Sequence, residues 1–144
     1  MTTSPHEWLC QYIVDHTQDA IIFADRAGII RLWNAGAEAI FGYTAAEALG
    51  HSLDLIIPER LRARHWEGYH RVSATGITHY DRRLLAVPAI RKDGTQISLE
   101  FTVVIVHEPT GEVLGIAAVL REVTERWQRD KAIQARLAAL ERGA

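Results

Sequence analysis

Hydrophobic residues recur in the N-terminal part of the chain with two different periods. They first have helical spacing, at Trp8, Leu9, Tyr12 and Ile13. Two apolar runs of strand length follow over residues 20–25 and 29–34, and the segment Arg26-Ala27-Gly28 separates them as a turn. This pattern predicts an N-terminal helix followed by a β-hairpin.

Two short helices are predicted next, because residues that typically cap the start and the end of a helix occur in pairs along this segment. Asn34 can cap a short helix that Gly42 closes. Thr44 and Glu47 have the spacing of a capping box, which predicts a second short helix that ends at Gly50. These signals indicate a compact helical connection after the hairpin.

The longest central helix is predicted over residues 59–75, after a short helical turn or extended segment at 53–58, and Gly76 ends it. Beyond Gly76 the pattern changes to strand alternation, with a hairpin signal at Asp93-Gly94. The three strands predicted there cover residues 80–91, 96–107 and 113–123. Pro88 in the first of them indicates an edge strand or a bulge.

The order of elements predicts an α+β fold, with a five-stranded antiparallel sheet and short helices on one face. A polar helix closes the chain, and its apolar residues stand at heptad-like positions, namely Val123, Ile133, Leu137 and Leu140. We therefore expect an N-terminal flanking helix in residues 1–17, one domain in residues 18–123 and a C-terminal helix in residues 124–144.

Composition excludes several classes of function. With 48% hydrophobic and 24% charged residues, the 144-residue chain is typical of one globular domain. A formal net charge of −2 offers no basic surface for nucleic acid. The apolar runs are too short for a membrane span and no signal-peptide pattern opens the chain, so we expect a cytoplasmic protein. Cys10 is the single cysteine, and no nucleophile elbow, phosphate loop or metalloprotease motif indicates an enzyme.

Several motifs, taken together, resemble those of PAS domains over roughly residues 10–130. They are Asn34 before the first short helix, Phe-Gly-Tyr at 41–43, Glu-x-x-Gly at 47–50, the Asp93-Gly94 hairpin and the exit Glu122-Val123-Thr124. The exit has Glu where the family has Asp. Members of this family are mostly sensors, so the resemblance implies a sheet-and-helix cup that holds a small molecule or a cofactor.

His65 is the residue with the most distinctive position in this pattern. Four residues share one face of the central helix, namely Leu61, His65, Gly68 and Val72. A neutral imidazole that faces an apolar interior is a suitable axial ligand for haem iron. A core histidine hydrogen-bonded within the fold explains the same pattern, so both interpretations stay open.

Residues 57–71 are similar to the helix that carries the proximal histidine in haem-containing PAS oxygen sensors. The resemblance implies haem b bound through His65 and a diatomic gas as the signal. Those sensors have an arginine at the position of Leu85, and Arg83 would replace it only if a bulge at Pro88 shifts the strand register. An apolar distal side favours carbon monoxide or nitric oxide over oxygen. The expected pocket comprises Leu61, His65, Gly68, Tyr69, Val72, Leu85, Ile97, Leu99, Ile116 and Ala118.

The flanking helices predict protein contacts. In PAS proteins such N-terminal helices pack across a dimer, and the exit helix often continues as a coiled coil into an output domain. We therefore expect a homodimer through the apolar stripe of the first helix and through the last helix, with a downstream signalling protein as partner. The ending Ala-Leu-Glu-Arg-Gly-Ala favours a stand-alone module over a fragment of a receptor.

Two other functions stay open at this point. The chain could be a haem-free interaction or dimerisation module whose cup is filled by side chains. It could also hold a small apolar metabolite or lipid. The size of the cavity beside His65 distinguishes these alternatives, because a filled core has none.

Overall fold

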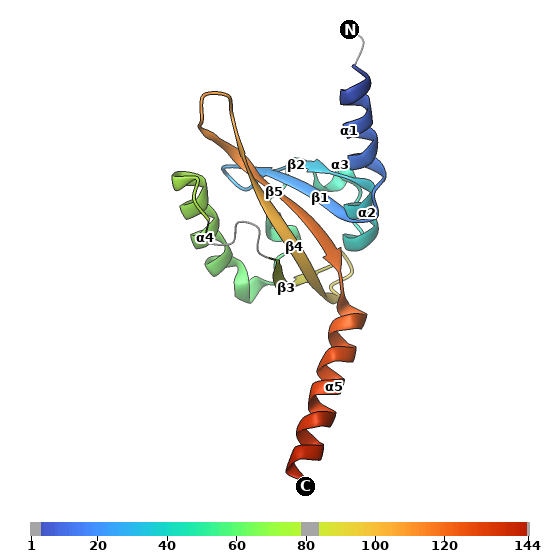
Figure 1. The fold of residues 1–144 in the computed structure, drawn as a ribbon. Coiled ribbons are helices and arrows are strands. Elements are labelled where there is room, and N and C mark those ends of the chain that lie inside the picture. Colours follow the sequence, from blue (N-terminus) through green and yellow to red (C-terminus); the bar gives the residue numbers. More distant parts are fainter. Residues whose placement is uncertain (1–3, 79–83, 144) are drawn as a thin grey trace.

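The centre of the molecule is one antiparallel sheet with the strand order β2-β1-β5-β4-β3 (Figure 1). The computed structural model describes residues 4–78 and 84–143. The strands are β1 (Ala20–Asp25), β2 (Ile30–Trp33), β3 (Leu85–Ile90), β4 (Gln96–His107) and β5 (Val113–Glu122). The predicted α+β fold with a five-stranded antiparallel sheet is confirmed.

Helices connect β2 to β3 and cover one face of the sheet. They are α2 (Ala35–Phe41), α3 (Ala45–Ala48), the 3-10 turns η1 (Leu53–Ile56) and η2 (Glu59–Leu61), and α4 (Arg62–Thr75). Side chains from these helices and from the inner face of the sheet form the main core, which includes Ile22, Ile30, Trp33, Phe41, Ile56, Ile97, Leu99 and Leu120. The burial of this apolar surface is the main force that holds the layers together.

Local capping signals produce the contacts that the sequence predicts. The Thr44 hydroxyl accepts a hydrogen bond from the Glu47 amide at 3.2 Å, and the Glu47 carboxylate accepts one from the Thr44 amide at 3.0 Å. Gly42 and Gly76 end α2 and α4 with φ of +85° and +68°, a left-handed conformation in which a glycine has no Cβ to clash.

Asn34 joins three elements through its side chain. Its Oδ1 accepts hydrogen bonds from the amides of Ile21 and Ala37, both at 2.9 Å. Its Nδ2 donates to the carbonyl oxygens of Val14 at 2.7 Å and Asp19 at 3.1 Å. The side chain therefore caps α2 and fixes the start of β1 beneath the end of α1 (Pro5–His16). Because only 4% of Asn34 is exposed, water cannot replace these partners.

Some predicted boundaries differ from the observed ones. The helix predicted over 59–75 begins as the 3-10 turn η2 and becomes an α-helix only at Arg62. The strand predicted over 80–91 is observed as Leu85–Ile90, and residues 79–83 lie outside the described part of the chain. Pro88 lies on the edge strand β3 and pairs in regular register with Ser98, so the alternative of a bulge at Pro88 was wrong.

The two flanking helices bury none of their residues in the domain. In Figure 1, α1 and α5 (Thr124–Arg142) project from the sheet in opposite directions. The four apolar residues of the N-terminal stripe are about half exposed, namely Trp8, Leu9, Tyr12 and Ile13. Within the described segments, no helix has both the length and the apolar character needed to cross a membrane.

Replacing Asn34 tests its role in the fold. We expect Asn34→Ala to lower the free energy of unfolding by about 2–4 kcal/mol, because it leaves several buried backbone groups unpaired. Thr44→Ala is the matched control, since it removes an exposed helix cap worth about 1 kcal/mol. Urea denaturation followed by circular dichroism measures both. Equal losses in the two variants would contradict the role assigned to Asn34.

Candidate ligand-binding site

A cavity of about 200 Å³ lies between α4 and the inner face of the sheet. Side chains of three neighbouring strands form its floor. The strand register places them side by side, because Ile22 pairs with Ala118 and Ala118 pairs with Val103. The lining comprises Ile22, Ala24, Leu53, His65, Tyr69, Val72, Thr78, Leu85, Phe101, Val103, Ile116 and Ala118. The cavity is thus apolar except for a few polar groups that come mainly from α4.

His65 is the basic side chain among the described residues of this lining. Its ring nitrogen Nδ1 is buried and has no hydrogen-bond partner among the described residues. Burial lowers the pKa of His65 below its ordinary value of 6.5; the nearby carboxylate of Asp54 acts in the opposite direction, and His70 adds to the lowering. The imidazole is therefore held neutral, with a free nitrogen that can bind a metal or a ligand.

Two aromatic side chains that follow His65 on α4 attach this helix to η1 and to the backbone at the end of β1. The Tyr69 hydroxyl lies 2.6 Å from the carbonyl oxygen of Asp25 and 3.1 Å from that of Ala24. Burial raises the pKa of the Tyr69 phenol, so it stays a hydrogen-bond donor. The Trp66 indole Nε1 donates to the Asp54 carboxylate at 2.7 Å.

Gly28 provides the surface on which the Trp66 indole rests. A Cβ at Gly28 would lie 2.1 Å from the ring atoms Cη2 and Cζ3 of Trp66, and the glycine has φ of +80°. The turn between β1 and β2 therefore accepts no side chain at this position. The distance between α4 and the sheet, and with it the cavity, depends on this contact.

Six of the ten expected pocket residues line the cavity, namely His65, Tyr69, Val72, Leu85, Ile116 and Ala118. The other four do not. Ile97 and Leu99 are 3% and 2% exposed and belong to the packed core, while Leu61 and Gly68 lie on α4 or just before it without reaching the lining. A Cβ built at Gly68 would meet no atom within 4 Å, so this position faces open space outside the cavity lining and no contact requires a glycine there.

The structure adds residues that the sequence analysis missed. Phe101 and Val103 take the places expected for Ile97 and Leu99, because β4 crosses beneath α4 further along its length. All four share one face of the strand, so the alternation alone could not distinguish them. Leu53 and Thr78 come from connecting segments without a periodic signal.

The lining fits haem in its chemistry more closely than in its volume. A neutral imidazole with an unpaired nitrogen, facing aliphatic side chains, is a suitable axial ligand for haem iron. The described residues contain no cluster of three or more side chains that could hold a metal ion. The cavity is smaller than the roughly 300–1,000 Å³ of small-molecule sites, so α4 would have to stand further from the sheet.

Arg62, at the start of α4, has partners outside the cavity lining. Arg62 donates to the carbonyl oxygen of Ile57 at 3.1 Å and lies 3.9 Å from the Asp54 carboxylate. Arg83, which the sequence analysis considered as a distal donor, lies outside the described residues. Leu85, which was expected on the distal side of a haem, lines the cavity, and its side chain carries no hydrogen-bond donor.

The outer face of the β3–β4 pair contacts the start of α5. The Val123 amide donates to the carbonyl oxygen of Ser98 at 2.9 Å, and the Ser98 amide donates to the Thr124 hydroxyl at 2.9 Å. Further along α5, Arg126 forms an ion pair with Glu100. The beginning of α5 is thus fixed to the strand whose inner face lines the cavity.

A five-stranded antiparallel sheet with a helical connection over one face, and a cavity between the two, defines a sensory domain of the PAS type. The family model of the PAS fold matches residues 14–128, so the chain belongs to this family. The sequence-based assignment to PAS domains is therefore confirmed.

Similar proteins include two longer bacterial proteins. An uncharacterised protein of Azorhizobium caulinodans is 39% identical over 123 residues, which cover 85% of this chain and 16% of that protein. The sensor protein FixL of Bradyrhizobium diazoefficiens is 31% identical over 116 residues, which cover 81% of this chain and 23% of FixL. The chain therefore spans less than a quarter of the length of either relative.

The fold is also similar to that of solved PAS domains. The PAS domain of the quorum-sensing receptor RpfR of Cronobacter turicensis, in complex with C12:0, has a TM-score of 0.62 and 18% identity. The match covers 77% of this chain and 99% of that domain. At this identity the comparison shows the shared fold alone.

The lowered pKa of His65 makes stability depend on pH. Below pH 6.5 the unfolded chain binds a proton at this position more readily than the folded one, so the free energy of unfolding falls as the pH falls through that range. Between pH 7 and the lowered pKa of His65, we expect the free energy of unfolding to fall less in His65→Leu than in wild type. Urea titrations at several pH values measure the difference, and identical pH dependence in the two proteins would contradict it.

Proposed function

We propose that this PAS domain is a sensor that binds haem through His65 and responds to a diatomic gas. The observation that carries the proposal is the buried, unpartnered Nδ1 of a neutral histidine on the wall of an apolar cavity. The similarity of residues 57–71 to the ligand helix of haem-binding PAS sensors supports it. When bound, haem supplies an iron that coordinates such a gas.

The side chains opposite His65 favour carbon monoxide or nitric oxide as the signal. Leu85, Phe101 and Ile116 would face the gas, and none of them donates a hydrogen bond. Bound oxygen is polarised and depends on a donor for its stability, whereas the other two gases depend on one less. His65 would hold the iron and these residues would exclude water from the distal side.

The signal would leave the cavity through the β3–β4 pair. Leu85 and Phe101 line the cavity and pair with each other across the two strands. Their neighbours Ala86 and Glu100 also pair, and they lie on the opposite face beside Trp127 of α5. A displacement of the inner side chains would therefore move the surface to which α5 is attached, and α5 would relay it to a partner protein.

Haem binding can be tested by absorption spectroscopy of the full chain expressed with a haem precursor. We expect a Soret band that His65→Ala removes or shifts, because the mutant lacks the axial nitrogen. His70→Ala is the matched control, since His70 is exposed on the same helix and does not line the cavity. The proposal is wrong if wild type takes up no haem or if both variants behave alike.

A small apolar ligand bound directly in the cavity is the second candidate. It is favoured by the largely aliphatic lining of the cavity, whose volume of about 200 Å³ lies below the usual range of small-molecule sites and so restricts the ligand to a molecule of few atoms. The RpfR PAS domain, which has a similar fold, has been solved in complex with C12:0. In the same experiment, a protein without a Soret band that co-purifies with an organic molecule identified by mass spectrometry would support this candidate.

We further propose that α1 mediates a homodimer. Its exposed apolar stripe has no partner among the described residues of the chain, and a second copy would cover it. We expect Ile13→Asp to shift sedimentation from dimer to monomer, because it places a charge in the interface. Gln11→Asp adds the same charge on another face of α1 and should leave the dimer intact. A monomeric wild type, or equal effects of both changes, would contradict the proposal.

A further inference from the structure

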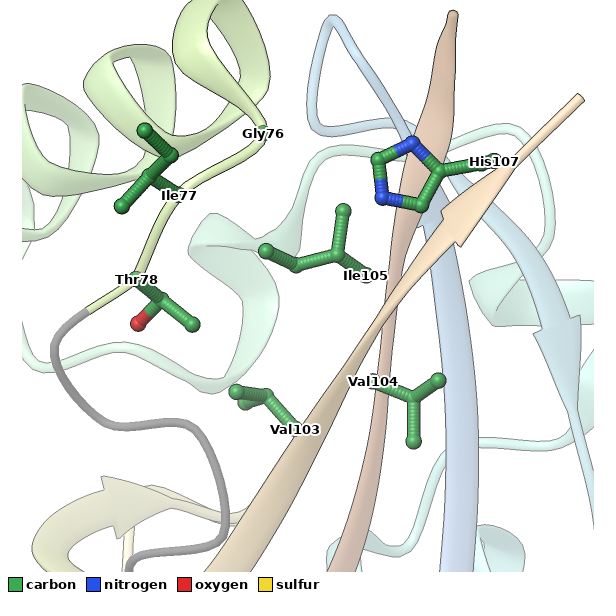
Figure 2. A pocket seen from close by; sticks show the side chains of 7 residues that line it. All are labelled: Gly76, Ile77, Thr78, Val103, Val104, Ile105 and His107. Carbon is green, nitrogen blue, oxygen red and sulfur yellow. The ribbon is translucent and has the colours of Figure 1, made fainter. Parts of the chain in front are cut away.

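A surface groove of about 400 Å³ lies where α4 ends beside β4 (Figure 2). Ile77 and Thr78 form one side, and Val103, Ile105 and His107 of β4 form the other. In Figure 2 the side chains of Thr78 and Val103 stand on opposite sides of the space between the two segments. This groove is distinct from the cavity beneath α4, and it is open to solvent.

The groove and the inner cavity meet at Thr78 and Val103, which line both. Three residues on the inner face of β4 lead from the cavity to the groove. Phe101 lines the cavity, Val103 lines both spaces, and Ile105 lines the groove but not the cavity. The opposite side shows the same order, from Val72 in the cavity through Thr78 to the groove. Two facing rows of side chains thus lead from the interior to the surface.

We propose that this groove is the entrance through which a small, uncharged and largely apolar molecule reaches the cavity. The described lining residues of the two spaces include no carboxylate, ammonium or guanidinium group. Imidazoles stand at the two ends, with His65 in the cavity and His107 at the surface. The inference rests on the proposed function only in that the cavity receives a ligand, and it holds for a gas and for a small apolar molecule alike.

The outer end of the groove is kept open by a glycine. Gly76 ends α4, and a Cβ at this position would lie 3.3 Å from both His107 Cε1 and Val113 Cγ2. The His107 ring is itself held in place, because its Nδ1 donates to the carbonyl oxygen of Gly111 at 3.0 Å. A side chain at position 76 would therefore narrow the space between α4 and β4.

Xenon is a suitable probe, because apolar cavities in proteins bind it without any cofactor. We would measure its exchange between water and the haem-free full chain by xenon NMR, and its site by the methyl resonances of Val103 and Ile116. Ile105→Phe enlarges a groove residue that does not line the cavity. We expect xenon exchange to slow by about tenfold, the effect of about 1.4 kcal/mol on a barrier, with unchanged affinity.

Two further variants complete the test. Ile105→Ala should speed exchange, which gives a result of opposite sign even if the phenylalanine variant fails to fold. Leu114→Phe adds the same bulk to an exposed position of β5 outside the groove and should leave the rate unchanged. Equal rates in all variants, equal slowing by Leu114→Phe, or xenon that leaves both methyl resonances unshifted would each overturn the proposal. Because no haem is used, a missing Soret band would leave the result unaffected.

Discussion

The fold depends on one buried amide, that of Asn34. Its two donors and its carbonyl oxygen pair with backbone groups of α1, β1, α2 and the segment between α1 and β1. A side chain that is fully paired in this way is stable inside a core, whereas each unpaired backbone group there would cost about 1–3 kcal/mol. Asn34 therefore sets where the sheet begins relative to both the N-terminal helix and the first helix of the cup.

The cavity exists because α4 is held at a distance from the sheet rather than packed into it. Tyr69 reaches the backbone at the end of β1, and Trp66 rests on Gly28 while it donates to Asp54. These contacts fix the helix turn that carries His65 relative to η1 and to the end of β1. The same contacts would limit how far α4 can separate from the sheet when a larger ligand binds.

Local signals in the sequence predicted most of the fold. Capping residues such as Thr44, the glycines that end helices and the alternation of the strands gave the order and type of the elements. For the site, helical spacing indicated His65 and Val72, which line the cavity, but it also indicated Gly68, which does not. The choice between Leu99 and Val103 required the crossing of β4 beneath α4, and this long-range geometry has no local signal. The packing of Trp66 on Gly28 joins two segments far apart in the chain and could not be inferred from either.

The chain segments that join α1 and α5 to the sheet lie side by side, although the two helices point in opposite directions. Ala20 at the start of β1 pairs with Leu120 near the end of β5, and Arg121 forms two hydrogen bonds, each of 3.1 Å, with the Asp19 carboxylate. The chain therefore enters and leaves the domain at the same end of the β1–β5 ladder, with α1 and α5 extending from it in opposite directions (Figure 1). A pulling force applied through the two helices would load the β1–β5 ladder at one end and unzip it pair by pair. Mechanical resistance at this joint would therefore be set by the first few pairs and by the Asp19–Arg121 contact, and hardly by the core beyond them.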